Sequence, residues 1–480
     1  APFPSWKRGG AVLIGACLIG LCIFGIRGRT GYNPIKVSAA YFCQDAFLNQ
    51  LGVSPTFNLL TSVMDDMRPE NKYLHLMDEQ EAITKAQALL NRPGDANVSP
   101  LAVYRHAAKA DSVQQRRPNV VLIMMESMSA KFMKHFGQSE TLTPFLDSLY
   151  TRSISFRNFY SAGIHTNHGL YATLYSFPAM MKRNLMKGSV IPRYSGLPTV
   201  LKENGYYNLF FMTHEGQYDN MNAFFRTNGY DEVFSQEDYP ADKVVNSFGV
   251  QDDFLYDYAI PVLNQRAATG QPFFATLLSI SNHPPYVIPP FFHPKTSGPE
   301  TQIVEYADWA LRQFFEEARK QPWFDNTIFV LEGDHGKLVG DAECELPESY
   351  NHIPLMIYSS RIQPEEKTTF GGQVDIQPTI LGLLNIDYLQ NNFGVDLLKE
   401  ERPCMFYTAD NMVVGRNDTL LYLYNYETQQ ELTYDIGNGK LNAVPMDDSF
   451  LPLKEYSFSM LQSAEFLVKH GKTLNSIPFT

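Results

Sequence analysis

The feature that most constrains the fold is a set of short, continuously apolar runs that recur along the chain. The first occupies residues 120–125, and similar runs occur in "YNLFFMT", "PFFATLLSIS", "NTIFVLEGD" and "IPLMIYSS". Runs of this length without polar alternation are typical of strands buried on both faces of a parallel sheet. Stretches with helical spacing, such as "EYADWALRQFFEEARKQ", lie between them. The sequence therefore predicts an α/β sandwich with a mainly parallel sheet.

An uncharged apolar stretch, residues 9–26, lies near the amino terminus. Basic side chains flank it on both sides: Lys7, Arg8, Arg27 and Arg29. Such a stretch is near the lower limit of about 18 residues for a membrane-spanning helix. A cleavable signal peptide is the alternative, but no small-x-small cleavage site clearly follows the long apolar core. We predict a transmembrane helix within residues 1–30, and because the chain starts at Ala1, we expect it to end a longer membrane region.

Changes in composition divide the rest of the chain into three parts. Residues 31–115 carry amphipathic stretches broken by prolines and the helical "DEQEAITKAQALLNR", which predicts a helical linker near the membrane surface. Residues 116–402 hold the apolar runs and form the predicted catalytic domain. In residues 403–480, the short patterns "CMFYTA", "TLLYLYNYE" and "QELTYDI" precede a helical stretch, which predicts a small antiparallel sheet with a terminal helix.

Charge and cysteine content exclude several classes of function. A formal charge of −12 and a pI near 5.4 give no broad basic surface, so nucleic acid is not an expected partner. The five cysteines form no C-x-x-C metal or redox pattern, and Cys17 and Cys22 lie inside the apolar stretch. We expect Cys43, Cys344 and Cys404 to be isolated thiols, with a Cys344–Cys404 disulfide as the alternative.

Polar residues stand where two of the buried runs end. Glu126 follows residues 120–125, and Asp334 and His335 follow "TIFVLEG". Ligands of open α/β sheets bind beyond the carboxyl ends of the strands. The pair in "GDHG" offers one hard oxygen and one imidazole nitrogen, and the glycines let the backbone direct both at one point. The alternative for this pair alone is a strand-end turn with a solvated aspartate.

Thr166, in "IHTNHGLYATLY", has two compatible interpretations. It suits the N-cap of the following helix, because its oxygen can accept a hydrogen bond from a free amide. A hydroxyl at a helix start can also attack an anionic phosphorus atom, while amides hold the other oxygens. Threonine lacks acidity, which a divalent cation bound to its oxygen would supply. Glu126, Asp334 and His335 are the expected ligands of that cation.

Six motifs stand out when the sequence is read as a whole: "PNVVLIMMES", "GIHTNHG", "FFATLLSISNHPPY", "EGDHG", "HIPLMIY" and "VDIQPTILGLL". Together they closely resemble the alkaline phosphatase superfamily, in its branch of membrane-anchored lipoteichoic acid synthase-like phosphoglycerol transferases, often called sulfatase domains. The resemblance covers about residues 116–400. It implies a three-layer sandwich and one divalent metal ion, with Mn²⁺ favoured over Mg²⁺ and Zn²⁺.

The resemblance also assigns roles to individual residues. It implies a metal site made of Glu126, Thr166, Asp334 and His335, with Thr166 as the nucleophile that carries a covalent phospho intermediate. His283 in "SNHPPY" matches a histidine that helps to bind substrate, and His214 in "MTHEGQYDNM" matches another. Asn282, next to His283, is a candidate for hydrogen bonds to the headgroup, as is Tyr286.

The function implied is transfer of a phosphoglycerol or related headgroup from a membrane phospholipid to a hydroxyl acceptor, such as a glycerophosphate polymer or a glycan. The expected location is the cytoplasmic membrane of a bacterium, with the catalytic domain outside the cytoplasm, in the periplasm or extracellular space. The alternatives are a phosphodiesterase, a phosphoethanolamine transferase, a sulfuric ester hydrolase and a silent binding protein. Type I sulfatases need C/S-x-P-x-R at the nucleophile, whereas this chain reads T-N-H-G-L, which disfavours sulfate ester hydrolysis.

Residues around the nucleophile depart from the family pattern. In the Gram-positive synthases Ser-Asp follows the threonine, whereas Asn167 and His168 follow it here. This difference argues against polyglycerolphosphate synthesis more than against the fold or the metal chemistry. His165 and His168 could contact phosphate or product, or make only local contacts. We expect His352 to have a structural role, at a strand start on the edge opposite the metal ligands.

Overall fold

The computed structural model describes residues 5–29, 34–43, 46–68, 71–91, 103–107, 117–188 and 191–475. The predicted catalytic-domain boundary at residue 116 and the end of the chain beyond residue 475 lie outside these ranges. The central sheet is built from β2 (Asn119–Met125), β3 (Ile154–Tyr160), β4 (Tyr207–Met212), β5 (Glu232–Phe234), β6 (Phe273–Leu278), β7 (Thr327–Gly333), β8 (Leu355–Tyr358) and β9 (Glu365–Gly372). Within the described ranges these eight strands have the order β5-β4-β6-β2-β7-β8-β3-β9.

All strands of this sheet run parallel except β8, which is antiparallel to both β7 and β3. The five predicted apolar runs form β2, β4, β6, β7 and β8, and the first four are buried along almost their whole length. Burial on both faces explains why these strands carry no polar alternation. The prediction of a mainly parallel sheet is confirmed.

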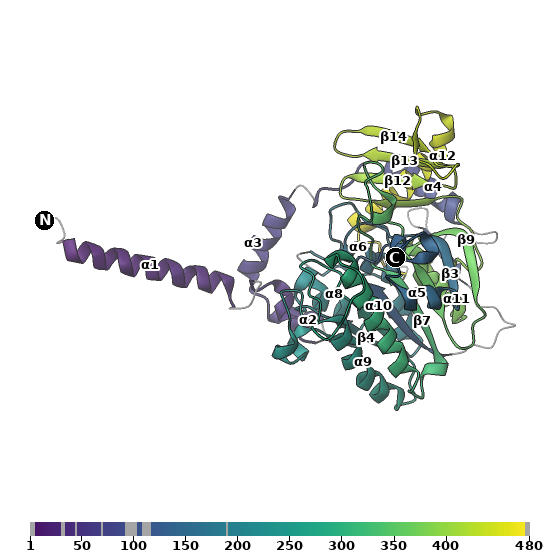
Figure 1. The fold of residues 1–480 in the computed structure, drawn as a ribbon. Helices are drawn as coiled ribbons and strands as arrows, with labels where there is room; N and C mark the ends of the chain where they lie inside the picture. The colour runs from purple at the N-terminus through teal and green to yellow at the C-terminus, as the bar shows by residue number, and fades with distance from the viewer. Residues whose placement is uncertain are drawn as a thin grey trace.

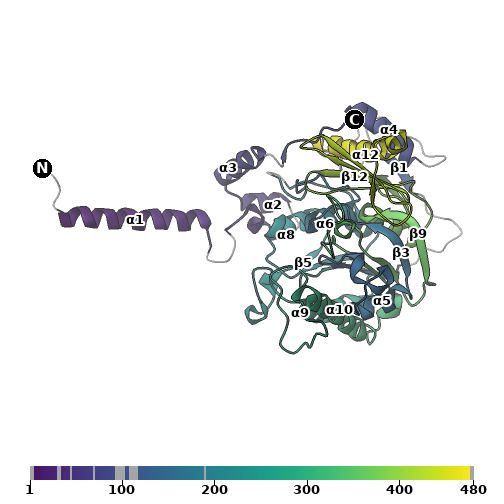
Figure 2. The ribbon, with the colours of Figure 1, turned by 45° about the horizontal axis from the view of Figure 1, so that its top comes forward.

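Helices cover both faces of the sheet and complete the three layers (Figures 1 and 2). One face packs against α5 (Pro144–Tyr150), α9 (Asp252–Ala267) and α10 (Pro299–Ala318), and the other against α6 (Thr166–Tyr175), α7 (Leu197–Glu203), α8 (Met221–Thr227) and α11 (Ile376–Leu383). Successive side chains of β2 alternate between the two cores: Val121 and Ile123 join the first, and Val120 and Leu122 join the second. The three-layer architecture is therefore confirmed.

A second sheet lies towards the carboxyl end of the chain. Its strands are β11 (Met405–Thr408), β12 (Met412–Arg416), β13 (Leu420–Asn425), β14 (Gln430–Asp435) and β15 (Asn442–Ala443). They form an antiparallel meander, and α12 (Leu451–Lys469) packs against it. The predicted small antiparallel sheet with a terminal helix is confirmed, although β12 and β15 had not been predicted.

Two elements from the predicted linker attach to this body. Helix α4 (Glu79–Leu90) packs against α12, and β1 (Tyr104–Ala107) pairs antiparallel with β10 (Tyr388–Asn391). Asp78 caps α4 by accepting hydrogen bonds from the amides of Gln80 and Glu81. Residues 79–107, where described, are thus held by the domain surface.

The amino-terminal helix α1 (Ser5–Arg27) stands away from the body (Figure 1). Its segment Gly9–Arg27 is long and apolar enough to cross a membrane, and none of it is buried in the protein. The expected apolar helix is therefore present, one residue longer at its carboxyl end than predicted. Two short helices follow, α2 (Ala46–Leu51) and α3 (Pro55–Asp66), before the chain reaches the body.

Candidate active site

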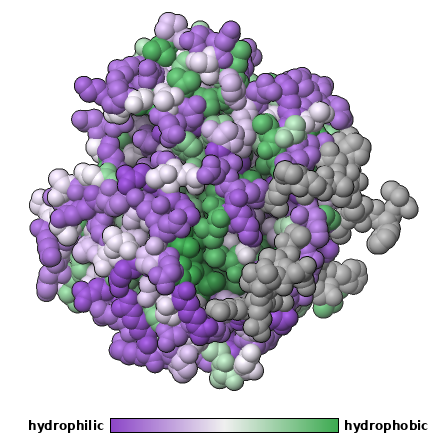
Figure 3. Space-filling view, turned by 90° about the vertical axis from the view of Figure 1, so that its right-hand side faces the viewer, coloured by the Kyte–Doolittle hydropathy of each residue, from purple (hydrophilic) through white to green (hydrophobic). Residues whose placement is uncertain are grey.

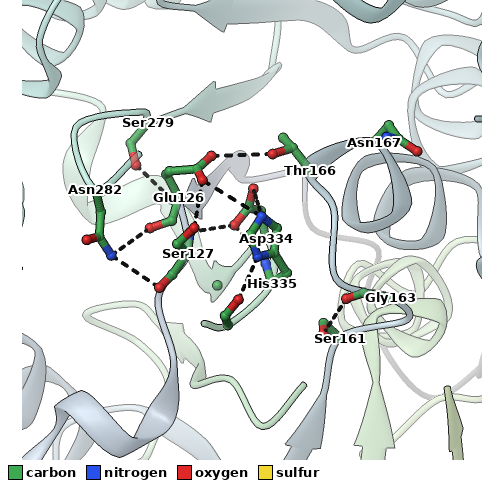
Figure 4. Close-up of polar contacts among 12 residues, drawn as sticks. Glu126, Ser127, Ser161, Gly163, Thr166, Asn167, Ser279, Asn282, Asp334 and His335 are labelled. Atoms are coloured by element: carbon green, nitrogen blue, oxygen red, sulfur yellow. Dashed lines mark hydrogen bonds and ion pairs between the residues drawn. The ribbon is translucent and has the colours of Figure 1, made fainter. Parts of the chain in front are cut away.

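The predicted metal ligands meet at the carboxyl edge of the central sheet. Strands β2 and β7 are neighbours, with Met125 opposite Gly333, so the residues that follow them emerge side by side. The ligand atoms of Glu126, Asp334 and His335 all lie within 4.8 Å of one another (Figure 4). Two segments more than 200 residues apart therefore build one cluster, as their positions at strand ends led us to expect.

Thr166 joins this cluster from helix α6. Its hydroxyl Oγ1 donates a hydrogen bond to Oε2 of Glu126 over 3.3 Å (Figure 4). The prediction that Thr166 is the N-cap is wrong: His165 has the extended backbone of a cap (φ −131°, ψ 147°), and Thr166 is the first helical residue. The hydroxyl contacts the carboxylate instead of a backbone amide of its own helix.

A close contact through Gly169 brings α6 to the end of β7. A Cβ atom at this glycine would lie 2.3 Å from the backbone oxygen of Asp334. Gln373 joins the same strand end to the loop before α6, because its Nε2 donates to that oxygen over 2.8 Å and its Oε1 accepts from the amide of Ala162 over 2.9 Å. Residues three apart share a helix face, so the approach at Gly169 also brings Thr166 to the candidate metal ligands.

Both carboxylates of the cluster are buried: Glu126 is 1% exposed and Asp334 is fully buried. Oδ1 of Asp334 accepts hydrogen bonds from the amides of Ser127 and His335, each over 2.7 Å, and Oε1 of Glu126 accepts one from the Ser127 hydroxyl. Oδ2 of Asp334 is buried and makes no hydrogen bond with any described residue. Burial, and then the nearby charge of Asp334, raise the pKa of Glu126 well above its ordinary value.

The histidine of the cluster is oriented by its backbone. Nδ1 of His335 lies 2.7 Å from the carbonyl oxygen of Gly336, to which its proton is donated. Nε2 faces the carboxylates, 3.8 Å from Oε1 of Glu126 and 3.7 Å from Oδ2 of Asp334. The cluster thus offers two buried carboxylates and one imidazole nitrogen, and Oδ2 of Asp334 has no hydrogen-bond partner among the described residues. This donor set fits a divalent cation.

Asn282 is placed by its contacts next to the loop after β2. Its Nδ2 donates to the carbonyl oxygens of Glu126 and Ser127 over 3.2 and 3.1 Å (Figure 4). Its Oδ1 accepts from Nζ of Lys337 over 2.5 Å. Both amide hydrogens are thereby used, which leaves one lone pair of Oδ1 for a headgroup. Asn282 therefore positions Glu126, a function that its sequence position did not reveal.

Lys337 is a site residue that the sequence analysis missed. Its ammonium also donates to the Tyr286 hydroxyl over 3.2 Å and lies over the rings of Tyr286 and Phe132. Burial lowers its pKa to about 8, although the charge of Glu126 opposes this shift. Its position two residues after His335, in "GDHGK", was the available signal.

The two histidines predicted to bind substrate follow neighbouring strands of the same sheet edge. His283, after β6, is partly buried; its Nδ1 lies 2.6 Å from the carbonyl oxygen of Pro284, and its ring packs against Phe248. His214, after β4, is buried and packs against Tyr218. Burial lowers the pKa of both imidazoles, which favours their neutral forms.

The other histidines contact protein groups. His165 reaches the second sheet, where its Nε2 lies 2.6 Å from Oδ1 of Asp410. His168 belongs to α6 and is buried, and burial lowers its pKa to about 3, so this ring is neutral. His352 packs between the rings of Tyr160 and Phe136, in line with a structural role.

The expected edge for His352 is wrong. Strand β8 is antiparallel to β7, with Leu355 opposite Glu332, so its first residue lies at the same edge as the metal ligands. An apolar run carries no information about strand direction, which explains the error. Cys344 and Cys404 are free thiols in the described chain, so the alternative of a disulfide is not supported.

A mainly parallel sheet with this cluster at its carboxyl edge defines an α/β fold of the alkaline phosphatase superfamily. A solved structure of a protein in that superfamily from Vibrio parahaemolyticus matches with a TM-score of 0.74 and 26% identity, over 84% of this chain and 98% of that one. The crystal structure of the lipoteichoic acid synthase LtaP from Listeria monocytogenes matches with a TM-score of 0.65 and 20% identity, over 81% of this chain and 98% of that one.

The chain belongs to the sulfatase family, whose model matches residues 118–386, more than half of its length. In sequence it is similar to lipoteichoic acid synthase 1 of Bacillus subtilis (strain 168), with 25% identity over 350 residues, which are 67% of this chain and 53% of that protein. It is also similar to the lipoteichoic acid synthase of Staphylococcus saprophyticus, with 24% identity over 367 residues, 69% of this chain and 54% of that protein. The chain thus spans about half the length of the curated relatives it matches.

Proposed function

We propose that this protein is a metal-dependent transferase of phosphoglycerol or a related headgroup, with Thr166 as its nucleophile. The observation that carries the proposal is the hydrogen bond from the Thr166 hydroxyl to Oε2 of Glu126, inside a buried cluster that fits a divalent cation. The similarity to lipoteichoic acid synthases supports a membrane phospholipid as donor and a hydroxyl group of a glycerophosphate polymer or glycan as acceptor. The helix α1 would anchor the enzyme, with its catalytic domain outside the cytoplasm.

A divalent cation, with Mn²⁺ as the first candidate, would be held by Glu126, Asp334, His335 and Thr166. It would make the threonine hydroxyl more acidic and stabilise charge on a bound phosphate. Glu126 orients the hydroxyl and is the first acceptor for its proton. The start of α6 would favour an anionic headgroup, because the amino-terminal end of a helix carries partial positive charge. His283, neutral and at the same edge, is suited to hold the headgroup.

The transfer takes place in two steps. Oγ1 of Thr166 forms a bond to phosphorus, and the bond from phosphorus to the lipid alcohol breaks, so the alcohol leaves with a proton. An acceptor hydroxyl then attacks the phosphothreonine, and Thr166 regains its proton as the product leaves. If water takes the place of the acceptor, the same residues catalyse phosphodiester hydrolysis.

Mass spectrometry of the full chain, incubated with phosphatidylglycerol and Mn²⁺, tests this proposal. We expect a phosphoglycerol adduct on Thr166 in the wild type and in Thr166→Ser, which keeps the hydroxyl. Thr166→Val should have neither adduct nor turnover, while its metal content stays close to that of the wild type. Wild-type turnover by Thr166→Val would mean that water is the nucleophile and would refute the transferase mechanism.

A further inference from the structure

A cavity of about 290 Å³ separates the segment after α1 from the catalytic body. We call it the juxtamembrane cavity. Its walls come from the 3₁₀ turn η1 (Val37–Ala40) and the residues before it, from one face of α3, and from the loop at residues 187–188 and Asn220. Phe57 and Thr61 line it from α3, and Arg68 lines it from just after that helix. These residues are four and seven apart, which is one and two turns along the same helix face.

Two ammonium groups line this cavity. Lys187 pairs with Asp219, with 2.8 Å between Nζ and Oδ1. Lys36 is partly buried, and its ammonium makes no ion pair or side-chain hydrogen bond with any described residue. Burial, and then the charge of Lys187, lower the pKa of Lys36, although the charges of Asp219 and Glu215 oppose this shift. An anionic group in the cavity would relieve this repulsion.

The cavity wall is connected to the catalytic threonine. The second carboxylate oxygen of Asp219 accepts a hydrogen bond from Nδ2 of Asn167 over 3.4 Å, and Asn167 is the residue next to Thr166. The same loop holds the segment after α1: Arg29 pairs with Glu215 over 2.8 Å. The cavity therefore lies between the membrane helix and the nucleophile.

The opposite face of α3 is apolar and exposed. Leu59, Leu60 and Val63 lie on it, and Leu60 is 60% exposed. Among the described residues, most of the large apolar side chains that stay exposed lie before residue 74. The side of the body away from α1 is mainly hydrophilic, apart from an apolar strip in a central hollow (Figure 3). Helix α3 lies across the direction of α1 (Figure 1), the orientation of a helix in the membrane interface.

We propose that the juxtamembrane cavity binds the headgroup phosphate of an anionic glycerophospholipid, with Lys36 and Lys187 as its cationic partners and α3 inserted in the membrane interface. The cations match the phosphate, and the exposed face of α3 matches the acyl chains that continue from it. The inference rests on the proposed function, to which it adds the place where the donor lipid waits beside Thr166.

Native mass spectrometry of the full chain, released from membranes with its bound lipids, tests the cavity. All variants carry Thr166→Ala, so that turnover does not consume the lipid and binding is measured apart from catalysis. We expect Lys36→Gln and Lys187→Gln each to weaken retention of phosphatidylglycerol about tenfold, the effect of losing one charge-assisted contact. Lys182→Gln, an exposed lysine that pairs with Glu427, is the matched control and should retain the lipid.

A second measurement tests the position of α3. The tryptophan fluorescence that Leu60→Trp adds should be quenched by brominated phosphatidylglycerol in proteoliposomes. The fluorescence that Leu451→Trp adds, at an exposed leucine at the start of α12, should not be quenched. The proposal is overturned if both glutamine variants retain the lipid, if soluble glycerol 3-phosphate displaces it at equal concentration, or if the two tryptophans are quenched equally. If the wild-type chain forms the adduct on Thr166 but the lysine variants retain the lipid unchanged, this inference alone is overturned. If the lysine variants lose the lipid but the wild-type chain forms no adduct, the proposed transfer alone is overturned.

Discussion

Replacement of Glu126 by glutamine should have opposite effects on stability with and without metal. In the metal-free protein, the carboxylates of Glu126 and Asp334 are buried within 4.8 Å of each other. At that separation and an effective dielectric constant of about 20, two unit charges repel by about 3 kcal/mol. Since the raised pKa of Glu126 already relieves part of this repulsion, 3 kcal/mol is an upper limit for the stability that Glu126→Gln gains without metal.

With metal, the sign is reversed. A cation at about 100 times its dissociation constant stabilises the wild type by about 2.7 kcal/mol, and the variant loses most of this gain together with one anionic ligand. At roughly 2 °C per kcal/mol for a large domain, the melting temperature of Glu126→Gln should lie up to about 6 °C above that of the wild type in EDTA, and below it in Mn²⁺.

Thermal unfolding of the detergent-solubilised full chain at pH 8, in EDTA and in Mn²⁺, measures both differences. Glu343→Gln removes an exposed carboxylate that pairs with Lys131 and should change neither melting temperature by more than about 1 °C. A Glu126→Gln variant that is less stable than the wild type in EDTA would refute the electrostatic reasoning. Equal melting temperatures of the wild type in EDTA and Mn²⁺ would refute the metal site.

Three further predictions concern the elements that support the site. Gly169→Ala should lower kcat at least 100-fold with the fold retained, because the new Cβ atom would push α6 away from β7. The control Gly298→Ala should be active, because no neighbouring atom lies nearer than 3.4 Å to its new Cβ atom. Asn282→Ala should lower metal affinity or activity about 10- to 100-fold, measured by metal titration and steady-state kinetics, because it frees the loop that carries Glu126. Burial raises the pKa of Asp308 to about 7, so the folded state binds more protons than the unfolded state between pH 4 and 7. The free energy of unfolding should therefore fall over this range, by up to about 1.4 kcal/mol per pH unit. Asp308→Asn should remove this dependence in denaturant titrations, and an unchanged slope would contradict it.

The sequence predicted those strands whose burial is complete, and the polar residues that lie together at their ends. Strand β2 is apolar throughout, so both its existence and the position of Glu126 could be read from it. Edge strand β9, by contrast, reads "EEKTTFGG": its first half is largely exposed, so no apolar run marks it. Edge strand β5 has three residues, too few for any pattern.

The contacts that complete the site could not be predicted, because they join residues distant in sequence. Gly169 looks like an ordinary helical glycine until the end of β7 lies against it. Asn282 was expected to face the substrate, and only the folded chain reveals that its amide holds the loop after β2. The direction of β8 depends on which neighbours it pairs with, and no local pattern encodes that choice.

The antiparallel direction of β8 has a consequence for how this site can change. Had β8 been parallel, the chain after His335 would have had to cross to the far edge of the sheet before re-entering it. Instead residues 334–354 leave and return at the same edge, next to the metal ligands, and Glu348 of this segment pairs with Arg416 of the second sheet. Its length is therefore not set by the width of the sheet. Insertions here would reshape the surface next to the candidate metal site while every strand kept its register, which makes this segment the place to engineer the acceptor preference of the proposed transferase.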